Sequence, residues 1–118
     1  MTSGVLPVYT PIMDITQPLA GYQRAALMRQ AHHLSAVATV GKQGVTQQVT
    51  IHVDIELTNH ERIKVRFSDF KEQRREIART LAEKTASRLV SVIGHVAVLY
   101  RPAPEEESRR IVIPERSR

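Results

Sequence analysis

The chain has 118 residues, no cysteine, and 17 lysines and arginines against 12 acidic residues, which gives a net charge of +5. This length predicts one domain with one hydrophobic core, and the lack of cysteine excludes thiolate chemistry, cysteine-based zinc sites and disulfides. No stretch resembles a signal sequence or approaches the roughly 20 apolar residues of a membrane span, and the basic balance favours a polyanionic partner, so we expect a soluble cytoplasmic protein.

The first 18 residues predict an extended or loosely docked arm. They hold three prolines, Pro7, Pro11 and Pro18, and a single charged residue, Asp14. Prolines at this spacing suit neither a helix nor a central strand, because each fixes its backbone and lacks an N–H donor. We therefore expect residues 1–18 to lie outside the main domain.

A helix and a strand follow the arm. The apolar spacing is helical from Leu19 to about His32 or His33, and residues 34–40 are a short apolar run closed by Gly41. The first pattern predicts an amphipathic helix and the second a buried strand. The helix face that we expect in the core carries Leu19, Tyr22 or Gln23, Ala26, Leu27 and Ala31.

Directly after this strand the sequence reads Gly41-Lys42-Gln43-Gly44, and Thr46 comes two residues later. The glycines leave backbone N–H groups unshielded, Lys42 adds positive charge, and Thr46 offers a hydroxyl where a helix can begin. These features indicate a phosphate clamp. An ordinary strand-to-helix turn fits the same four residues, and the loop alone does not distinguish the two.

Residues 46–59 carry two conflicting patterns. Apolar and polar residues alternate from 49 to 57, which is typical of a half-buried strand. Thr46 can equally cap a helix that Asn59 terminates. The helical reading places one stripe in the core, formed by Val45, Val49, Val53 and Leu57. The local pattern leaves both structures open.

Residues 62–67 predict a strand whose outer face is basic. Its apolar and basic residues alternate, with Ile63, Val65 and Phe67 facing the core and Arg62, Lys64 and Arg66 facing outward. Between residues 62 and 88 nine basic residues outnumber four acidic ones, so this window holds the whole positive excess. Lys64 and Arg66 can meet phosphates or can form an ordinary solvated sheet face, and the pattern favours neither.

A third helix and a hairpin complete the domain. Ser68 or Asp69 should cap the helix, which should run to about Ala86. Two apolar runs, 89–93 and 96–100, flank a glycine-containing turn, and this arrangement predicts a hairpin. In the helix we expect core contacts from Phe70, Ile77, Leu81 and the aliphatic stem of Arg74. Pro102 and Pro104 end the hairpin, and the polar tail, 103–118, contains one apolar triplet, Ile111, Val112 and Ile113.

Arginines on the two outer helices are ambiguous in the same way as Lys64 and Arg66. Arg24 and Arg29 lie on the first helix, and Arg74, Arg75 and Arg79 lie on the third, where Glu72 and Glu76 can neutralise part of the charge. We favour the first helix for phosphate contact because it leads into the strand before the glycine loop.

No motif in the sequence indicates catalysis. The five histidines are adjacent or lie in different elements, without carboxylates at ligand spacing. The sequence also lacks a nucleophile elbow, a Walker loop, a dinucleotide fingerprint and paired carboxylates in an apolar setting. We therefore expect a protein that is not an enzyme and takes no metal, cofactor or small-molecule substrate.

With this order of elements the sequence resembles the YhbY family of bacterial CRM-domain proteins. The matching stretches are 29–34, 40–46, 60–65, 92–95 and 98–102, which fall in one order within residues 19–102. The resemblance implies a compact two-layer α/β domain of order α-β-α-β-α-β-β, with a four-stranded mixed sheet and a KH-like G-x-x-G loop between the first strand and the second helix. It therefore makes residues 46–59 a helix. It also implies a shape like the C-terminal domain of bacterial translation initiation factor three.

The resemblance further implies RNA binding, with bacterial members associated with large-subunit ribosomal precursors and plant relatives acting in group II intron splicing. We thus expect a monomer that binds large-subunit ribosomal RNA in assembling particles. The expected contacts are Gly41, Lys42, Gln43, Gly44, Thr46, Arg24, Arg29, Lys64 and Arg66.

Two positions depart from the family pattern. Ala86 and Ser87 stand where members usually carry a glycine, so a left-handed helix end there would fall on a strained residue. Ile51 and Ile55 stand where charged residues are usual, and on a helix they would form an exposed apolar pair. This pair, with the tail triplet and the arm, supports an alternative function as a protein-interaction adaptor or self-associating module.

Overall fold

The computed structural model describes residues 19–70 and 72–105, which hold seven elements. In chain order these are α1 (Gly21–Ala31), β1 (Ala36–Val40), α2 (Gln47–His60), β2 (Arg62–Phe67), α3 (Arg74–Lys84), β3 (Arg88–Ile93) and β4 (Val96–Tyr100). The predicted order α-β-α-β-α-β-β is confirmed. The arm, residues 1–18, and the tail triplet at 111–113 lie outside the described residues.

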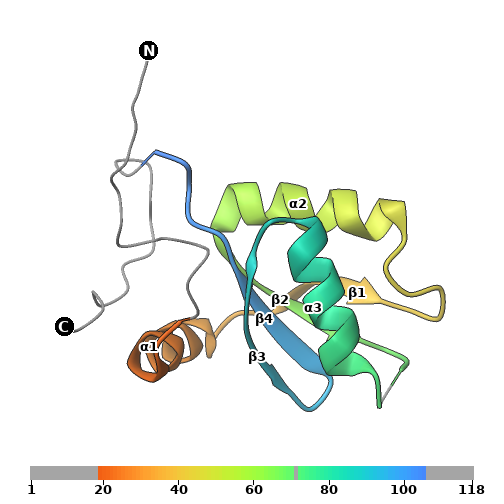
Figure 1. Ribbon diagram of the computed structural model, residues 1–118, viewed down its shortest axis with the longest axis horizontal. Coiled ribbons are helices and arrows are strands. Elements are labelled where there is room, and N and C mark those ends of the chain that lie inside the picture. Colours follow the sequence, from red (N-terminus) through yellow and green to blue (C-terminus); the bar gives the residue numbers. More distant parts are fainter. Residues whose placement is uncertain (1–18, 71, 106–118) are drawn as a thin grey trace.

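The four strands form one mixed sheet in the order β1-β2-β4-β3. β1 pairs with β2 in parallel, while β4 pairs antiparallel with both β2 and β3. β2 and β4 are therefore central, and β1 and β3 are the two edges of the sheet (Figure 1). α2 supplies the crossover that a parallel pair requires. The mixed sheet and the β3–β4 hairpin confirm the predicted fold.

Apolar side chains on the two faces of the sheet form two core clusters. On one face, Val53 and Leu57 of α2 and Leu81 of α3 pack over β1, β2 and β4. On the other, Leu27 and Ala31 of α1 pack over β3 and β4. The strand β4 serves both clusters because successive side chains point to opposite faces. α1 thus adds a partial third layer to the two layers expected (Figure 1).

Residues 47–60 are helical, as the resemblance implied and the alternation did not. Thr46 caps the helix, and its Oγ1 accepts a hydrogen bond of 3.1 Å from the N–H of Val49. Ile51 and Ile55, the other apolar residues of the alternation, are 52% and 50% exposed. The helix ends at His60, one residue beyond Asn59, and Glu61 follows in the left-handed region with φ 64°.

The predicted start of α3 at Ser68 or Asp69 is wrong. The N–H of Ser68 donates to the Val40 carbonyl at 3.0 Å, which prolongs the contact between β1 and β2 beyond the strands themselves. The Asp69 carboxylate accepts from the N–H of Phe70, whose φ is +61°. This left-handed residue turns the chain, so the helix begins only at Arg74. Phe70 consequently stays outside both core clusters.

Arg101 and Glu61 fasten the chain after β4 to the C-terminal end of α2. The Arg101 guanidinium donates to the Asp54 carboxylate at 2.6 Å, to the Thr58 hydroxyl at 2.9 Å and to the Thr85 carbonyl at 2.7 Å. Glu61 is buried; its carboxylate accepts from the N–H of Ala103 at 2.9 Å, and its carbonyl from the N–H of Arg101 at 2.7 Å. We call this set of contacts the clasp.

Candidate nucleic-acid interface

Two local backbone hydrogen bonds shape the glycine loop, residues 41–44, and its junction with α2. The carbonyl of Gly41 accepts from the N–H of Gly44 at 3.0 Å, and the carbonyl of Gly44 accepts from the N–H of Thr46 at 3.0 Å. Gly44 has a φ of +76°, a conformation that L side chains rarely adopt. At Gly41 a Cβ would meet only Ser68 Oγ, at 3.8 Å. Gly44 is therefore the glycine that the turn requires.

The loop presents backbone donors to its surroundings. Within residues 19–70 and 72–105, the N–H groups of Lys42 and Gln43 have no acceptor, and neither do those of Gln47 and Gln48 in the first turn of α2. The side chains of Lys42 and Gln43 are exposed. Unsatisfied N–H groups carry the positive end of the helix dipole, so this corner attracts anions. The arrangement suits a phosphate better than a neutral group.

Lys64 and Arg66 lie on β2, the strand that pairs with β1 and so runs beside the strand leading into the loop. Arg66 pairs with Thr39 and Lys64 with Ala36 in the parallel ladder, so Arg66 is the closer of the two to the end of β1, where the loop begins. Both side chains alternate with the core residues Ile63 to Phe67 and therefore project from the face that α1 shares. Arg66 is exposed and Lys64 half-buried. Arg66 thus lies beside the end of β1 where the loop begins, and Lys64 lies beside the start of β1.

Arg62, at the start of the same strand, has a structural role. Its Nη1 donates to Gln30 Oε1 at 2.6 Å, which ties β2 to α1. Burial lowers the pKa of its guanidinium, and the neighbouring charges of Glu61 and Tyr100 oppose that shift. The exposed basic surface of β2 therefore consists of Lys64 and Arg66.

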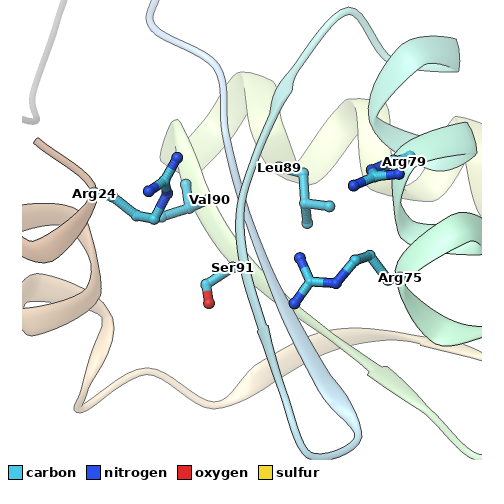
Figure 2. A pocket seen from close by; sticks show the side chains of 6 residues that line it. All are labelled: Arg24, Arg75, Arg79, Leu89, Val90 and Ser91. Carbon is cyan, nitrogen blue, oxygen red and sulfur yellow. The ribbon is translucent and has the colours of Figure 1, made fainter. Parts of the chain in front are cut away.

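The arginines of α1 lie apart from the glycine loop. α1 precedes the first residue of β1, whereas the loop follows its last residue, so the strand separates them (Figure 1). Arg29 is exposed in the last turn of α1. Arg24 instead lines a groove of about 490 Å³ together with Arg75 and Arg79 of α3 (Figure 2). The structure therefore divides the predicted contact residues between two places.

Sequence reasoning left Arg75 and Arg79 out of the site, because the first helix leads into the strand before the glycine loop; Glu72 and Glu76 were expected to neutralise part of their charge. Within residues 19–70 and 72–105, neither Arg75 nor Arg79 forms an ion pair with Glu72 or Glu76. The sequence did contain one indication of this site: Arg75 and Arg79 are four residues apart, which places both on one face of a helix.

The described part of the chain offers no metal site and no membrane-spanning helix. It contains no group of three or more histidine, aspartate or glutamate side chains placed to hold a metal ion. None of its helices combines the length and the apolar character needed to cross a membrane.

A small α/β domain that presents a G-x-x-G loop between a strand and the crossover helix defines a recognisable structural class. The chain belongs to the CRS1/YhbY (CRM) domain family, whose model matches residues 19–101. The family resemblance seen in the sequence is thereby confirmed, and the match covers all seven elements of the fold.

Individual relatives agree with this assignment. The chain is 35% identical over 88 residues to a Haemophilus influenzae protein named "RNA-binding protein", an alignment covering 74% of this chain and 89% of that one. It is 33% identical over 97 residues to "Probable RNA-binding protein YqeI" of Bacillus subtilis, covering 81% and 99% of the two chains. The solution structure of SAV1595 from Staphylococcus aureus, described as an RNA-binding candidate, superposes with a TM-score of 0.66 at 34% identity, over 80% of this chain and 99% of that one.

Proposed function

We propose that this protein binds structured RNA, namely large-subunit ribosomal RNA in assembling particles, through the glycine loop and the basic face of β2. The observation that carries the proposal is the cluster of unsatisfied N–H groups at Lys42, Gln43 and the first turn of α2, placed beside the Lys42 ammonium. Relatives at 33% and 35% identity are named for RNA binding, which supports the same partner.

Phosphate and shape dominate the proposed recognition. The N–H groups of the loop hold a phosphate, Thr46 adds a hydroxyl at the helix N-terminus, and Lys64 and Arg66 attract the neighbouring backbone. Phe67 and Tyr100 are each 1% exposed, so these two rings cannot serve as base-stacking platforms without unfolding the core. The protein acts by binding and not by catalysis, as a cytoplasmic monomer.

Residues 19–102 form the RNA-binding unit in this proposal, with the arm, 1–18, and the tail, 103–118, attached to it. Gly41 and Gly44 shape the loop, while Lys42 and Gln43 stand at its tip. Arg29 offers a further contact on α1. Arg24 does not lie at the loop; it lines the groove at β3 with Arg75 and Arg79.

A charge reversal at the loop tip tests the proposal. Lys42→Glu should weaken binding to a large-subunit ribosomal RNA fragment roughly tenfold or more, because it places a carboxylate against a phosphate. Gly44 should be kept, since its φ of +76° would strain any replacement and confuse folding with binding. The measurement is the dissociation constant by fluorescence anisotropy across 50 to 200 mM salt, the range over which phosphate contacts show most clearly.

The matched control is Lys84→Glu, an equal change of charge at an exposed position in the last turn of α3. It should leave the affinity near that of the wild type. Wild-type affinity that does not change with salt would rule out phosphate binding. A Lys42→Glu variant that binds like the Lys84→Glu control would move the site away from the loop.

A second candidate function, from a different class, is a protein-interaction adaptor. Ile51 and Ile55 lie one helical turn apart on α2 and are about half exposed, at 52% and 50%. Adjacent exposed aliphatic side chains of this size mark an interaction surface. The tail triplet at 111–113, which the same hypothesis includes, lies outside the described residues.

A further inference from the structure

The groove at the β3 edge is built by three elements that are distant in the sequence. Arg24 of α1 lies on one side of β3, and Arg75 and Arg79 of α3 lie on the other, with their guanidiniums directed toward the strand (Figure 2). Leu89, Val90 and Ser91 of β3 form the rest of the lining. We call this site the arginine groove.

The arginine groove is positively charged and has no acidic residue in its lining. Within the described residues, the guanidiniums of Arg75 and Arg79 form no hydrogen bond or ion pair, and Arg24 makes only a 3.4 Å contact with the Leu19 carbonyl. All three side chains are exposed. Like charges at i, i+4 on a helix repel each other, so Arg75 and Arg79 are placed together at some cost in stability. An anionic ligand would remove that repulsion.

The strand beneath these arginines also indicates the class of ligand. β3 is an edge strand, and among the described strands it pairs only with β4. An edge can accept a peptide strand, but the register of β3 shifts between Leu89 and Ser91, which is the stretch that lines the groove. A bulge interrupts the regular ladder that an added strand needs. The groove is therefore better suited to a chain of anions than to a peptide strand.

We propose that the arginine groove holds a second stretch of RNA phosphate backbone, separate from the stretch bound at the glycine loop. The proposal rests on the proposed function for the choice of RNA as the anion. β1 and β3 are opposite edges of the sheet, three strand spacings or about 14 Å apart. The loop and the groove therefore contact different phosphates of the bound RNA.

Removing two groove charges tests this inference. The variant Arg75→Gln with Arg79→Gln should lower the slope of log affinity against log salt by about 1.8, because each lost phosphate contact removes about 0.9. As the salt rises from 50 to 200 mM, the ratio of wild-type affinity to variant affinity should fall roughly tenfold. The probe is a folded fragment of large-subunit ribosomal RNA, and the readout is the dissociation constant at four salt concentrations. Lys84→Glu, which changes the net charge by the same two units on the same helix, should keep the wild-type slope.

The outcomes separate this inference from the proposed function. If the wild type binds with a steep salt dependence and the groove variant matches Lys84→Glu, the inference is wrong and the loop proposal stands. If the groove variant loses slope while Lys42→Glu does not, the groove stands and the loop proposal is wrong. If both the loop and the groove bind RNA, the losses of binding free energy should add in a variant that combines Lys42→Glu with Arg75→Gln and Arg79→Gln. Sites this far apart act independently.

A poly-glutamate peptide gives a second arm of the test. The competing occupant of the groove is an acidic protein segment, for which Arg75 and Arg79 would be needed for the peptide and not for RNA. Peptide binding that depends on both arginines, with RNA affinity the same in the groove variant and in Lys84→Glu, would overturn the inference. Loss of RNA affinity in the groove variant alone supports it, whatever the peptide does.

Discussion

Two helices of this domain are followed by non-glycine residues in the left-handed region of backbone conformation. Glu61 follows α2 with φ 64°, and Ala86 follows α3 with φ 54°. A residue with a Cβ loses about 1 kcal/mol in this region relative to glycine. Glu61 is held by the clasp, whereas Ala86 stands where the family usually has a glycine. The left-handed turn after α3 is thus retained without the glycine, on a strained alanine.

Replacing Ala86 should consequently stabilise the protein. Ala86→Gly relieves the left-handed strain but adds freedom to the unfolded chain, so we expect a net gain of about 0.5 kcal/mol in the free energy of unfolding. Urea denaturation followed by circular dichroism measures it. Ala25→Gly, an exposed alanine inside α1, should instead lose about 1 kcal/mol. Equal losses in both variants would contradict the strain at Ala86.

Arg101 should be a key residue for stability, since it holds α2, the end of α3 and β4 together. Arg101→Ala removes hydrogen bonds to Asp54 and Thr58 and leaves the carbonyl of the buried Thr85 without that donor. We expect a loss of about 2–3 kcal/mol, measured by urea denaturation. Arg29→Ala, at an exposed arginine of α1, should stay within about 0.5 kcal/mol of the wild type. A loss in Arg101→Ala no larger than this would show that the clasp contributes little.

At the scale of the element, α2 shows where local pattern and tertiary structure disagree. The alternation over residues 49–57 is that of a strand, yet the segment is a helix, because Val53 and Leu57 find a core that the helical stripe alone matches. Ile51 and Ile55 are the apolar residues that this choice leaves outside. The family resemblance resolved a conflict that propensity could not.

The outer face of α2 provides the test of the adaptor hypothesis. Ile51→Glu with Ile55→Lys replaces an exposed apolar pair by an i, i+4 ion pair, so the free energy of unfolding should change by less than about 0.5 kcal/mol. If the pair mediates self-association, the wild type should sediment faster than this variant at high concentration. If the wild type and the variant both sediment as monomers, α2 does not mediate self-association. RNA affinity should be the same in both proteins.

The start of α3 was not predictable from the caps alone. Ser68 and Asp69 are good N-cap residues, but the tertiary contact of Ser68 with β1 and the left-handed Phe70 delay the helix to Arg74. By contrast, β2 and the hairpin carried unambiguous signals: strict alternation and a two-residue glycine turn. Elements whose pattern agrees with their burial were predictable, and the boundary set by long-range contacts was not.

At the scale of the whole molecule, the two candidate contact regions differ in whether local sequence or long-range contacts define them. The glycine loop is contiguous, so its residues could be named from the sequence. The arginine groove joins Arg24 to Arg75 and Arg79 from elements on opposite faces of the sheet, and only the strand order brings them around β3. Helical spacing could relate Arg75 to Arg79, but nothing local relates either residue to Arg24.

The clasp also determines the position of Ala103, just beyond β4. Because Glu61 holds Ala103 at the C-terminal end of α2, Ala103 lies about 21 Å from the glycine loop, the length of a helix of 14 residues. A fluorophore attached at position 103 is therefore held a full helix away from the loop. A label at this position leaves the loop open to large RNAs, which suits it to single-molecule binding measurements.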